Sequence, residues 1–310
     1  MTHHLKLIGF VKDNHRELEW SGLAENPNAI NLLSQAFEEN DSDNIDWSWL
    51  SKNPNAITLL ESNPNMINWK LLSRNPNAIE LLESNPNLID WFWLSQNPNA
   101  INLLSQALSK SLDGIEHEIS WEYLSMNPNA IKLLSRYPDK INWLWLSQNP
   151  NAINLLTGNP DNIHWDFLSL NPNAIGLLEA NLDKIHWEYL SQNPNAIELL
   201  TANRNMIHWK GLSLNPNAIE LLDANPNMIH WEELSQNPNA MELLDANQDK
   251  IDWEWLSGNP GIFEYDYQAM KARMYDSGIC EALMANRFHP SNVDKWHGWG
   301  FEDMVPDGAR

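Results

Sequence analysis

Short runs of apolar residues, separated by Asn-Pro pairs, alternate along most of this chain of 310 residues. After Asn75 and Pro76, apolar side chains stand at positions 78, 79, 81 and 82, which is one face of a helix and not the alternation of a strand. In the next run, Leu88, Trp91 and Leu94 recur every three residues and again fit a helical face. The pattern therefore predicts pairs of short helices.

This pair of runs is a repeating unit. The motif Trp-x-x-Leu, followed shortly by Asn-Pro, begins eleven times at a spacing of 22 residues, with two longer steps of 27 and 30 residues. The longer steps mark insertions near residues 34–44 and 105–118. A fixed period of this length indicates a repeat architecture in which each unit packs on its neighbours.

The Asn-Pro pairs are expected to separate the helices. Asparagine is a favoured N-cap and proline fits the first helical position, while the residue before proline is pushed out of the α region. Each predicted helix has about two turns, roughly 12 Å at 1.5 Å per residue, and is too short to be stable alone. Stability must therefore come from stacking.

The sequence predicts an all-α protein, an α-solenoid in which about eleven short helix-turn-helix units over residues 20–260 form a superhelix. An open, curved rod on the order of 100 Å long is expected from helix spacings of 8 to 10 Å. Residues 1–19 and 261–310 are expected to be helical caps at its two ends. A leucine-rich horseshoe with strands is the alternative, which the frequent prolines and the lack of valine or threonine runs disfavour.

The repeat tryptophans and the leucines three residues after them are expected to form the seam between stacked units. At roughly 25 cal/mol per Å² of buried apolar surface, truncating one tryptophan would cost several kcal/mol of stability. A carbohydrate-binding platform is the alternative for this column. The predicted seam residues are Trp47, Trp69, Trp91, Trp121, Trp143, Trp165, Trp187, Trp209, Trp231 and Trp253.

A second aromatic column lies two residues after the repeat tryptophans, with interruptions such as Gly211 and Glu233. Aromatic side chains in a row are candidate anchors for a protein partner. Packing at the edge of the core and glycan binding are the alternatives. The candidate partner-binding residues in this column are Trp49, Trp93, Tyr123, Trp145 and Tyr189.

The formal charge of -22 argues against direct binding of nucleic acid and favours a basic protein as partner. Glutamates recur at one repeat position, Glu198, Glu220 and Glu242, so stacked repeats would align them in a stripe. Such a stripe could bind a basic partner or simply keep the solenoid in solution. Self-association is also compatible with the sequence.

Four consecutive units carry a histidine before the repeat tryptophan. A metal site is disfavoured there because stacked equivalents lie about 10 Å apart, whereas zinc ligands converge within about 2.1 Å of one ion. A polar column is the simpler interpretation, although protonation in mildly acidic solution would add positive charge to an acidic segment. The histidines are His164, His186, His208 and His230.

No phosphate loop, metalloprotease motif or nucleophile elbow is present in the sequence. We therefore expect a protein that is not an enzyme and has no cofactor or bound metal. The single cysteine, Cys280, excludes an internal disulfide framework. No segment has the length and apolar character of a membrane span, and the broken apolar run at the amino terminus leads us to expect no signal peptide.

The repeated motif NPNAIxLLxxNPxxIxWxxLSxNPNA, over about residues 20–260, resembles tandem-repeat proteins encoded by large nucleocytoplasmic DNA viruses of algae and amoebae. The tail ALMANRFHPSNVDKWHGWGF, residues 282–301, is similar to the His-Pro-containing endings of proteins of those viruses. The resemblance implies a viral protein in the virion or the host-cell interior. We expect a non-enzymatic interaction scaffold, a minor capsid-associated protein whose partners are capsid proteins, with an acidic adaptor or inhibitor of a basic host protein as the alternative.

Overall fold

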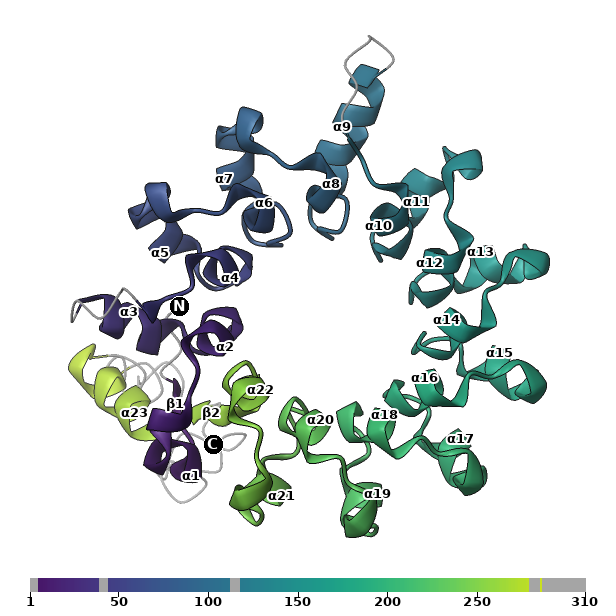
Figure 1. Cartoon of the computed structure of the whole chain (residues 1–310). Helices are drawn as coiled ribbons and strands as arrows, with labels where there is room; N and C mark the ends of the chain where they lie inside the picture. The colour runs from purple at the N-terminus through teal and green to yellow at the C-terminus, as the bar shows by residue number, and fades with distance from the viewer. Residues whose placement is uncertain (1–4, 39–43, 112–117, 279–284, 286–310) are drawn as a thin grey trace, which may run out of the picture. The chain divides into compact units, whose positions relative to one another are not determined.

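The computed structural model describes residues 5–38, 44–111, 118–278 and 285, in a chain that divides into two units. One unit is Leu7–Phe263, and the other combines Met1–Lys6 with Glu264–Arg310. The repeats lie in Leu7–Phe263, which is built from two rows of short helices (Figure 1). The prediction of an all-α solenoid is thus confirmed.

The helices of the inner row, here called the Trp helices, each begin at a repeat tryptophan (Figure 1). Successive Trp helices pack against one another, as in the pairs α10 and α12, α16 and α18, and α20 and α22. The Trp helices are α2 (Trp20–Glu25), α4 (Trp47–Lys52), α6 (Trp69–Leu72), α8 (Trp91–Leu94), α10 (Trp121–Met126), α12 (Trp143–Gln148), α14 (Trp165–Ser169), α16 (Trp187–Gln192), α18 (Trp209–Leu214), α20 (Trp231–Ser235) and α22 (Trp253–Ser257).

The helices of the outer row, here called the Leu helices, begin one residue after the alanine of Asn-Pro-Asn-Ala and contain the Leu-Leu pair. They are α3 (Ile30–Glu38), α5 (Ile57–Ser62), α7 (Ile79–Ser84), α9 (Ile101–Ser111), α11 (Ile131–Leu134), α13 (Ile153–Thr157), α15 (Ile175–Glu179), α17 (Ile197–Ala202), α19 (Ile219–Asp223) and α21 (Met241–Asp245).

In the units whose second segment is fully described, the second predicted helix is divided in two, which corrects the expectation of two helices per unit. A 3-10 turn ends at Leu88, Ile89 is extended with φ −67° and ψ 124°, and α8 then begins at Trp91. Asp90 fixes this start, because its Oδ1 accepts a hydrogen bond from the N–H of Trp93 at 3.1 Å. The 3-10 turns are η1 (His15–Glu17), η3 (Pro64–Met66), η4 (Pro86–Leu88), η5 (Pro138–Lys140), η6 (Pro160–Asn162), η7 (Leu182–Lys184), η8 (Arg204–Met206), η9 (Pro226–Met228), η10 (Gln248–Lys250) and η11 (Pro260–Ile262).

The Asn-Pro pairs do not cap the α-helices as the sequence predicted, although Asn259 caps the 3-10 turn η11. Asn85 makes no side-chain cap bond to the turn that follows it, and its Nδ2 donates back to the carbonyl of Leu81 at 2.9 Å. Asn75 accepts from the N–H of Asn77 at 3.0 Å, and α7 begins only at Ile79. The last carbonyls of a short helix lack intrahelical partners, so an amide donor is better used there.

A buried asparagine joins each repeat to the one before it. The side chain of Asn75 is fully buried, and its Nδ2 donates to the carbonyls of Ser51 at 3.1 Å and Asn53 at 2.7 Å in the preceding repeat. The same two bonds recur throughout, and these residues are here called the junction asparagines. They are Asn26, Asn53, Asn75, Asn97, Asn127, Asn149, Asn171, Asn193, Asn215, Asn237 and Asn259.

A buried serine makes a second link between repeats. The hydroxyl of Ser147 donates to the carbonyl of Trp143 at 2.8 Å within α12 and accepts the backbone N–H of His164 in the next repeat at 3.0 Å. Both functions of one hydroxyl are used, which is why a small polar residue can be fully buried at this position. In the first repeat the equivalent residue is Ala24, which cannot make this link.

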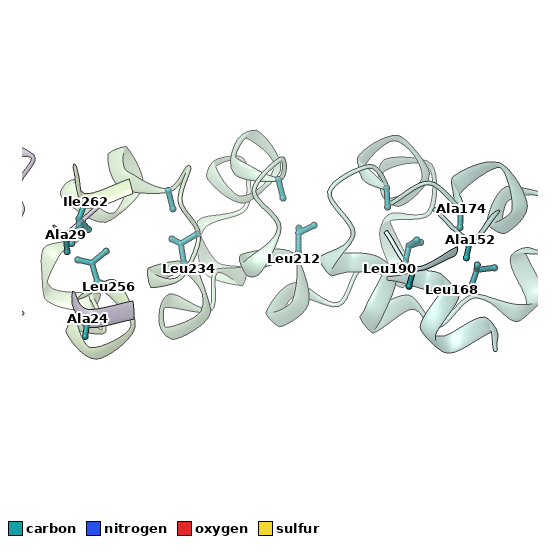
Figure 2. Packing of buried hydrophobic residues seen from close by; sticks show 14 of the residues in the cluster. Ala24, Ala29, Ala152, Leu168, Ala174, Leu190, Leu212, Leu234, Leu256 and Ile262 are labelled. Carbon is teal, nitrogen blue, oxygen red and sulfur yellow. The ribbon is translucent and has the colours of Figure 1, made fainter. Parts of the chain in front are cut away.

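The fully buried core consists of leucine and alanine columns (Figure 2). Leu190, on a Trp helix, and Leu200, on a Leu helix, have no exposed surface, and Ala196 between them is also fully buried. The repeat tryptophans pack against this core but are only partly buried. The repeat tryptophans predicted as the seam thus line the core, and the leucines three residues after them are its most buried residues.

The array of repeats in Leu7–Phe263 is closed. Helix α2 packs against α22, and Asn26 donates to the carbonyls of Ser257 at 3.1 Å and Asn259 at 2.8 Å. These are the bonds that join all the other repeats. The backbone N–H of Glu19 likewise donates to Oγ of Ser257 at 2.8 Å.

Figure 2 shows the closure in the core, where Ala24 and Ala29 of the first repeat lie beside Leu256 and Ile262 of the last. The open rod expected from the sequence is thus wrong for this unit. A small rotation between successive repeats is repeated until the eleventh Trp helix meets the first, which leaves the array without free ends.

The eleventh repeat is assembled from both ends of the unit. Its Trp helix is α22, and the place of its Leu helix is taken by α1 (Gly9–Asp13). Val11 is fully buried at the position of the buried leucines, and the N–H of Ile8 donates to the carbonyl of Ile262 at 3.0 Å. Asn14 donates to the carbonyl of Phe10 at 2.8 Å, as Asn85 does in its own repeat.

The expected amino-terminal cap is therefore corrected for the described part of residues 1–19. With no free end to cover, the apolar residues of α1 complete a repeat. A cap is needed only where a terminal repeat exposes an apolar layer.

The second unit, which combines Met1–Lys6 with Glu264–Arg310, contains the helix α23 (Tyr267–Asp276). In this unit Nζ of Lys6 lies 3.5 Å from Oε1 of Glu264. A two-stranded sheet joins β1 (Leu5–Leu7) and β2 (Phe263–Tyr265). Most of the predicted tail, residues 279–284 and 286–310, and the inserted residues 39–43 and 112–117 lie outside the described residues.

Candidate functional site

The repeat tryptophans stand at the first position of each Trp helix, half-buried against the core. In two repeats the ring receives a lysine side chain from the 3-10 turn of the same repeat. The Nζ of Lys184 lies 4.4 Å from the ring centre of Trp165, and the Nζ of Lys250 lies 4.4 Å from that of Trp231. These distances are typical of cation–π contacts.

The polar column before the repeat tryptophans consists mainly of helix N-caps. Asp46, Asn68 and Ser120 accept backbone N–H bonds of their helices, and the Nδ1 atoms of His186 and His208 do so as well. The sequence identified this column as polar but not its capping function. Within the described residues, no group of three or more His, Cys, Asp or Glu side chains is placed to hold a metal ion.

The aromatic column on the Trp helices forms a row with two groups of ring contacts. The rings of Trp93 and Tyr123 stack with centres 5.3 Å apart and an angle of 27°. Further along, Phe167 lies between Trp145 at 5.5 Å and Tyr189 at 6.2 Å, in edge-on contacts. The members between α8 and α16 are half-buried, so they pack largely against one another.

The most exposed aromatic side chains of the Trp helices are Trp49, Phe92 and Trp255. Trp49 is 38% exposed, with Lys52 over its ring at 5.2 Å, and Trp255 is 47% exposed. Phe92 is 41% exposed and contacts Tyr123 edge-on at 5.2 Å. Sequence reasoning missed Phe92, because it stands one residue after the repeat tryptophan, where polar residues predominate.

The row ends at a polar segment on α18 and α20. Gly211 replaces an aromatic residue because a Cβ there would lie 2.8 Å from the carbonyl oxygen of Glu188. Lys210 forms an ion pair with Glu233 at 2.9 Å, and the Glu233 side chain is only 9% exposed. The hydrogen bond and charge of Glu233 raise the pKa of Lys210 above its usual value. Nothing in the sequence pattern indicated this pair.

The acidic candidates lie on the other row of helices. Glu198, Glu220 and Glu242 stand in the first turns of α17, α19 and α21, and all three are exposed. They form no ion pair within the described residues. The structure therefore does not bring the acidic candidates and the aromatic candidates together into one site.

Two cavities occupy equivalent positions in different repeats, and sequence reasoning missed both. One, of about 360 Å³, lies beside Trp20, and the other, of about 400 Å³, lies beside Trp91. Each is bounded by the extended Leu helix of its repeat, α3 or α9. The signal in the sequence was the segment Ile-Asn-Leu-Leu-Ser-Gln-Ala, which occurs at residues 30–36 and 101–107 before the two insertions.

Comparison of the chain with family models, with curated proteins and with solved structures finds no match. In the part of the chain that the structure describes, no helix combines the length and apolar character needed to cross a membrane.

Proposed function

We propose that this protein is a non-enzymatic scaffold for protein–protein interaction. One observation carries the proposal: the repeats form a closed array in which side chains at equal positions line up in rows across successive helices, as the aromatic row from Trp93 to Tyr189 shows. Extended rows of this kind suit contact with another macromolecular surface. The two rows of helices offer such a partner chemically different surfaces.

The proposed setting is the particle of a large DNA virus, where the protein is a minor capsid-associated component. This part of the proposal rests on the resemblance of the repeat motif to tandem-repeat proteins of such viruses. A closed array has no free ends at which further copies would stack, so it suits a defined position better than a growing filament.

Cross-linking mass spectrometry on purified particles tests this setting. We expect cross-links from lysines such as Lys52 and Lys70, beside the exposed aromatic side chains, to a capsid protein. Absence of the protein from purified particles, together with its presence in the infected-cell lysate, would remove the virion component of the proposal.

An acidic adaptor or inhibitor of a basic host protein is the second candidate. The observation that favours it is the exposed glutamates Glu198, Glu220 and Glu242 on successive Leu helices, without ion-pair partners within the described residues. Binding of histones at low salt should weaken steeply as the salt concentration rises. The triple Glu→Gln variant is the matched control, and equal histone binding by that variant would count against this candidate.

Glycan binding receives less support from the geometry. Sugars bind to free aromatic faces, whereas the faces of Trp93 and Tyr123 are stacked on each other. Titration with glycans, followed by tryptophan fluorescence, would show this function if it exists.

A further inference from the structure

The two equivalent cavities differ in the charge around them. Both contain the same four residue types at the same repeat positions, which are Trp20, Leu32, Gln35 and Ala36 in the first and Trp91, Leu103, Gln106 and Ala107 in the second. The ionisable residues that line the first cavity are the basic His15 and Arg16. Among the described residues that line the second, Glu83 is the ionisable one and none is basic.

Two other repeats show what kind of side chain packs on the repeat tryptophan. In the repeats of Trp165 and Trp231, the Leu helix ends two residues before an asparagine, and the turn after that asparagine places Lys184 or Lys250 over the indole. In the repeats with cavities the asparagine is replaced by Ala36 or Ala107, and α3 and α9 continue beyond it. A long side chain with an aliphatic stem thus fits beside the tryptophan in those two regular repeats.

The Trp91 cavity suits such a side chain when it carries a positive charge. Trp91, Leu103 and Ala107 offer apolar surface for an aliphatic stem, and Glu83 offers a carboxylate for an ammonium group. Its volume of about 400 Å³ is within the range of small-ligand sites. The net charge of -22 also favours the approach of a basic partner.

We propose that the Trp91 cavity binds a lysine side chain presented by a basic partner protein. The Trp20 cavity, with the same apolar frame, rejects a lysine because Arg16 stands at its rim. This inference deepens the proposed scaffold function and rests on it, since it identifies how one side chain of a partner is held.

A peptide that copies residues 246–252 of the chain (ANQDKID) is a suitable probe, because it contains Lys250 with its native neighbours. The control peptide carries norleucine in place of the lysine, which keeps the aliphatic stem and removes the charge. The full-length protein is labelled with 5-fluorotryptophan, and the resonances of the two cavity indoles are assigned with Trp20→Phe and Trp91→Phe. Fluorine NMR then reports each cavity separately.

The lysine peptide should shift the Trp91 resonance in a saturable way and bind roughly 3- to 10-fold more tightly than the norleucine peptide, as expected for a cation–π contact and an exposed ion pair. The Trp20 resonance should not move. In Glu83→Gln the lysine peptide should bind about as weakly as the norleucine peptide. Asn87→Arg, which copies Arg16 into this cavity, should have the same effect.

Both substitutions are at exposed residues, so they leave the core intact. Equal binding of the two peptides, equal shifts at both indoles, or no shift at Trp91 would each overturn the proposal. These outcomes are separate from the scaffold function, because a partner cross-linked elsewhere on the array would uphold that function even with an inert Trp91 cavity.

Discussion

Closure of the array predicts that Asn26 is as important for stability as a junction asparagine in the middle of the chain. Asn26→Asp is a narrow perturbation, because the retained Oδ1 still accepts the N–H of Asn28, which lies at 3.0 Å from it. The substitution removes the two Nδ2 bonds to the carbonyls of Ser257 and Asn259, and it places a buried carboxyl oxygen against those carbonyls, which adds to the loss at both sites. Asn149→Asp removes the equivalent bonds within the array and is the matched comparison.

The size of the effect follows from burial. Asn26 and Asn149 have no exposed surface, so the abandoned carbonyl groups cannot turn to water. Two lost hydrogen bonds at about 1 kcal/mol each, with buried acceptors left unsatisfied, give a loss on the order of 3 to 5 kcal/mol in the free energy of unfolding. Because the bonds are the same at both sites, the two variants should lose similar amounts.

Urea denaturation followed by far-UV circular dichroism measures both variants against the unmodified protein. In an open rod, Asn26 would stand at an end and donate to no repeat, and its substitution would change the free energy of unfolding by less than about 0.5 kcal/mol. A near-neutral Asn26→Asp beside a destabilising Asn149→Asp would therefore refute the closed array.

Three further substitutions test other contacts. Gly22→Ala should lower the free energy of unfolding by about 1 to 3 kcal/mol in the same denaturation assay, because its Cβ would lie 2.7 Å from Cβ of Ser257. In the control Gly176→Ala the new Cβ meets nothing within 4 Å, so this variant should be more stable by up to about 1 kcal/mol. Val11→Ala should cost about 2 kcal/mol in thermal or urea unfolding if α1 completes the eleventh repeat, while an unchanged midpoint would show α1 to be dispensable. The pKa of Lys210 is raised, so its pair with Glu233 contributes fully to stability below the usual lysine pKa of 10.5. This contribution is lost as the pH rises through the higher pKa of the folded protein. The urea midpoints of the unmodified protein and of Lys210→Met should therefore converge only in strongly alkaline solution.

The sequence by itself determined the local structure of this protein. The spacing of Ala78, Ile79, Leu81 and Leu82 predicted a helical face, and the repeat of 22 residues predicted stacking, because two-turn helices cannot stand alone. Both predictions depend on periodicity within a short window, which the chain states directly. The aromatic column was also visible, since equal repeat positions must align wherever repeats stack.

Only the tertiary structure decided the direction in which the amide of Asn85 points and whether the repeat tryptophans or the leucines are fully buried. The amide of Asn85 can bond to the helix before it or to the turn after it, and the burial of a side chain depends on the helices packed against it, so the repeat pattern alone decides neither outcome. The pairing of Lys210 with Glu233 and the two equivalent cavities depend on contacts between helices in the same way.

Closure is the clearest case of this division. Whether the repeats form a rod or return to their start depends on the small rotation between neighbours, summed over eleven steps, and no single repeat specifies that sum. Residues 8–14 have a cap-like appearance in the sequence because their partner, α22, lies at the far end of the array. The sequence determined the unit, and the packing of its last copy against its first determined the whole.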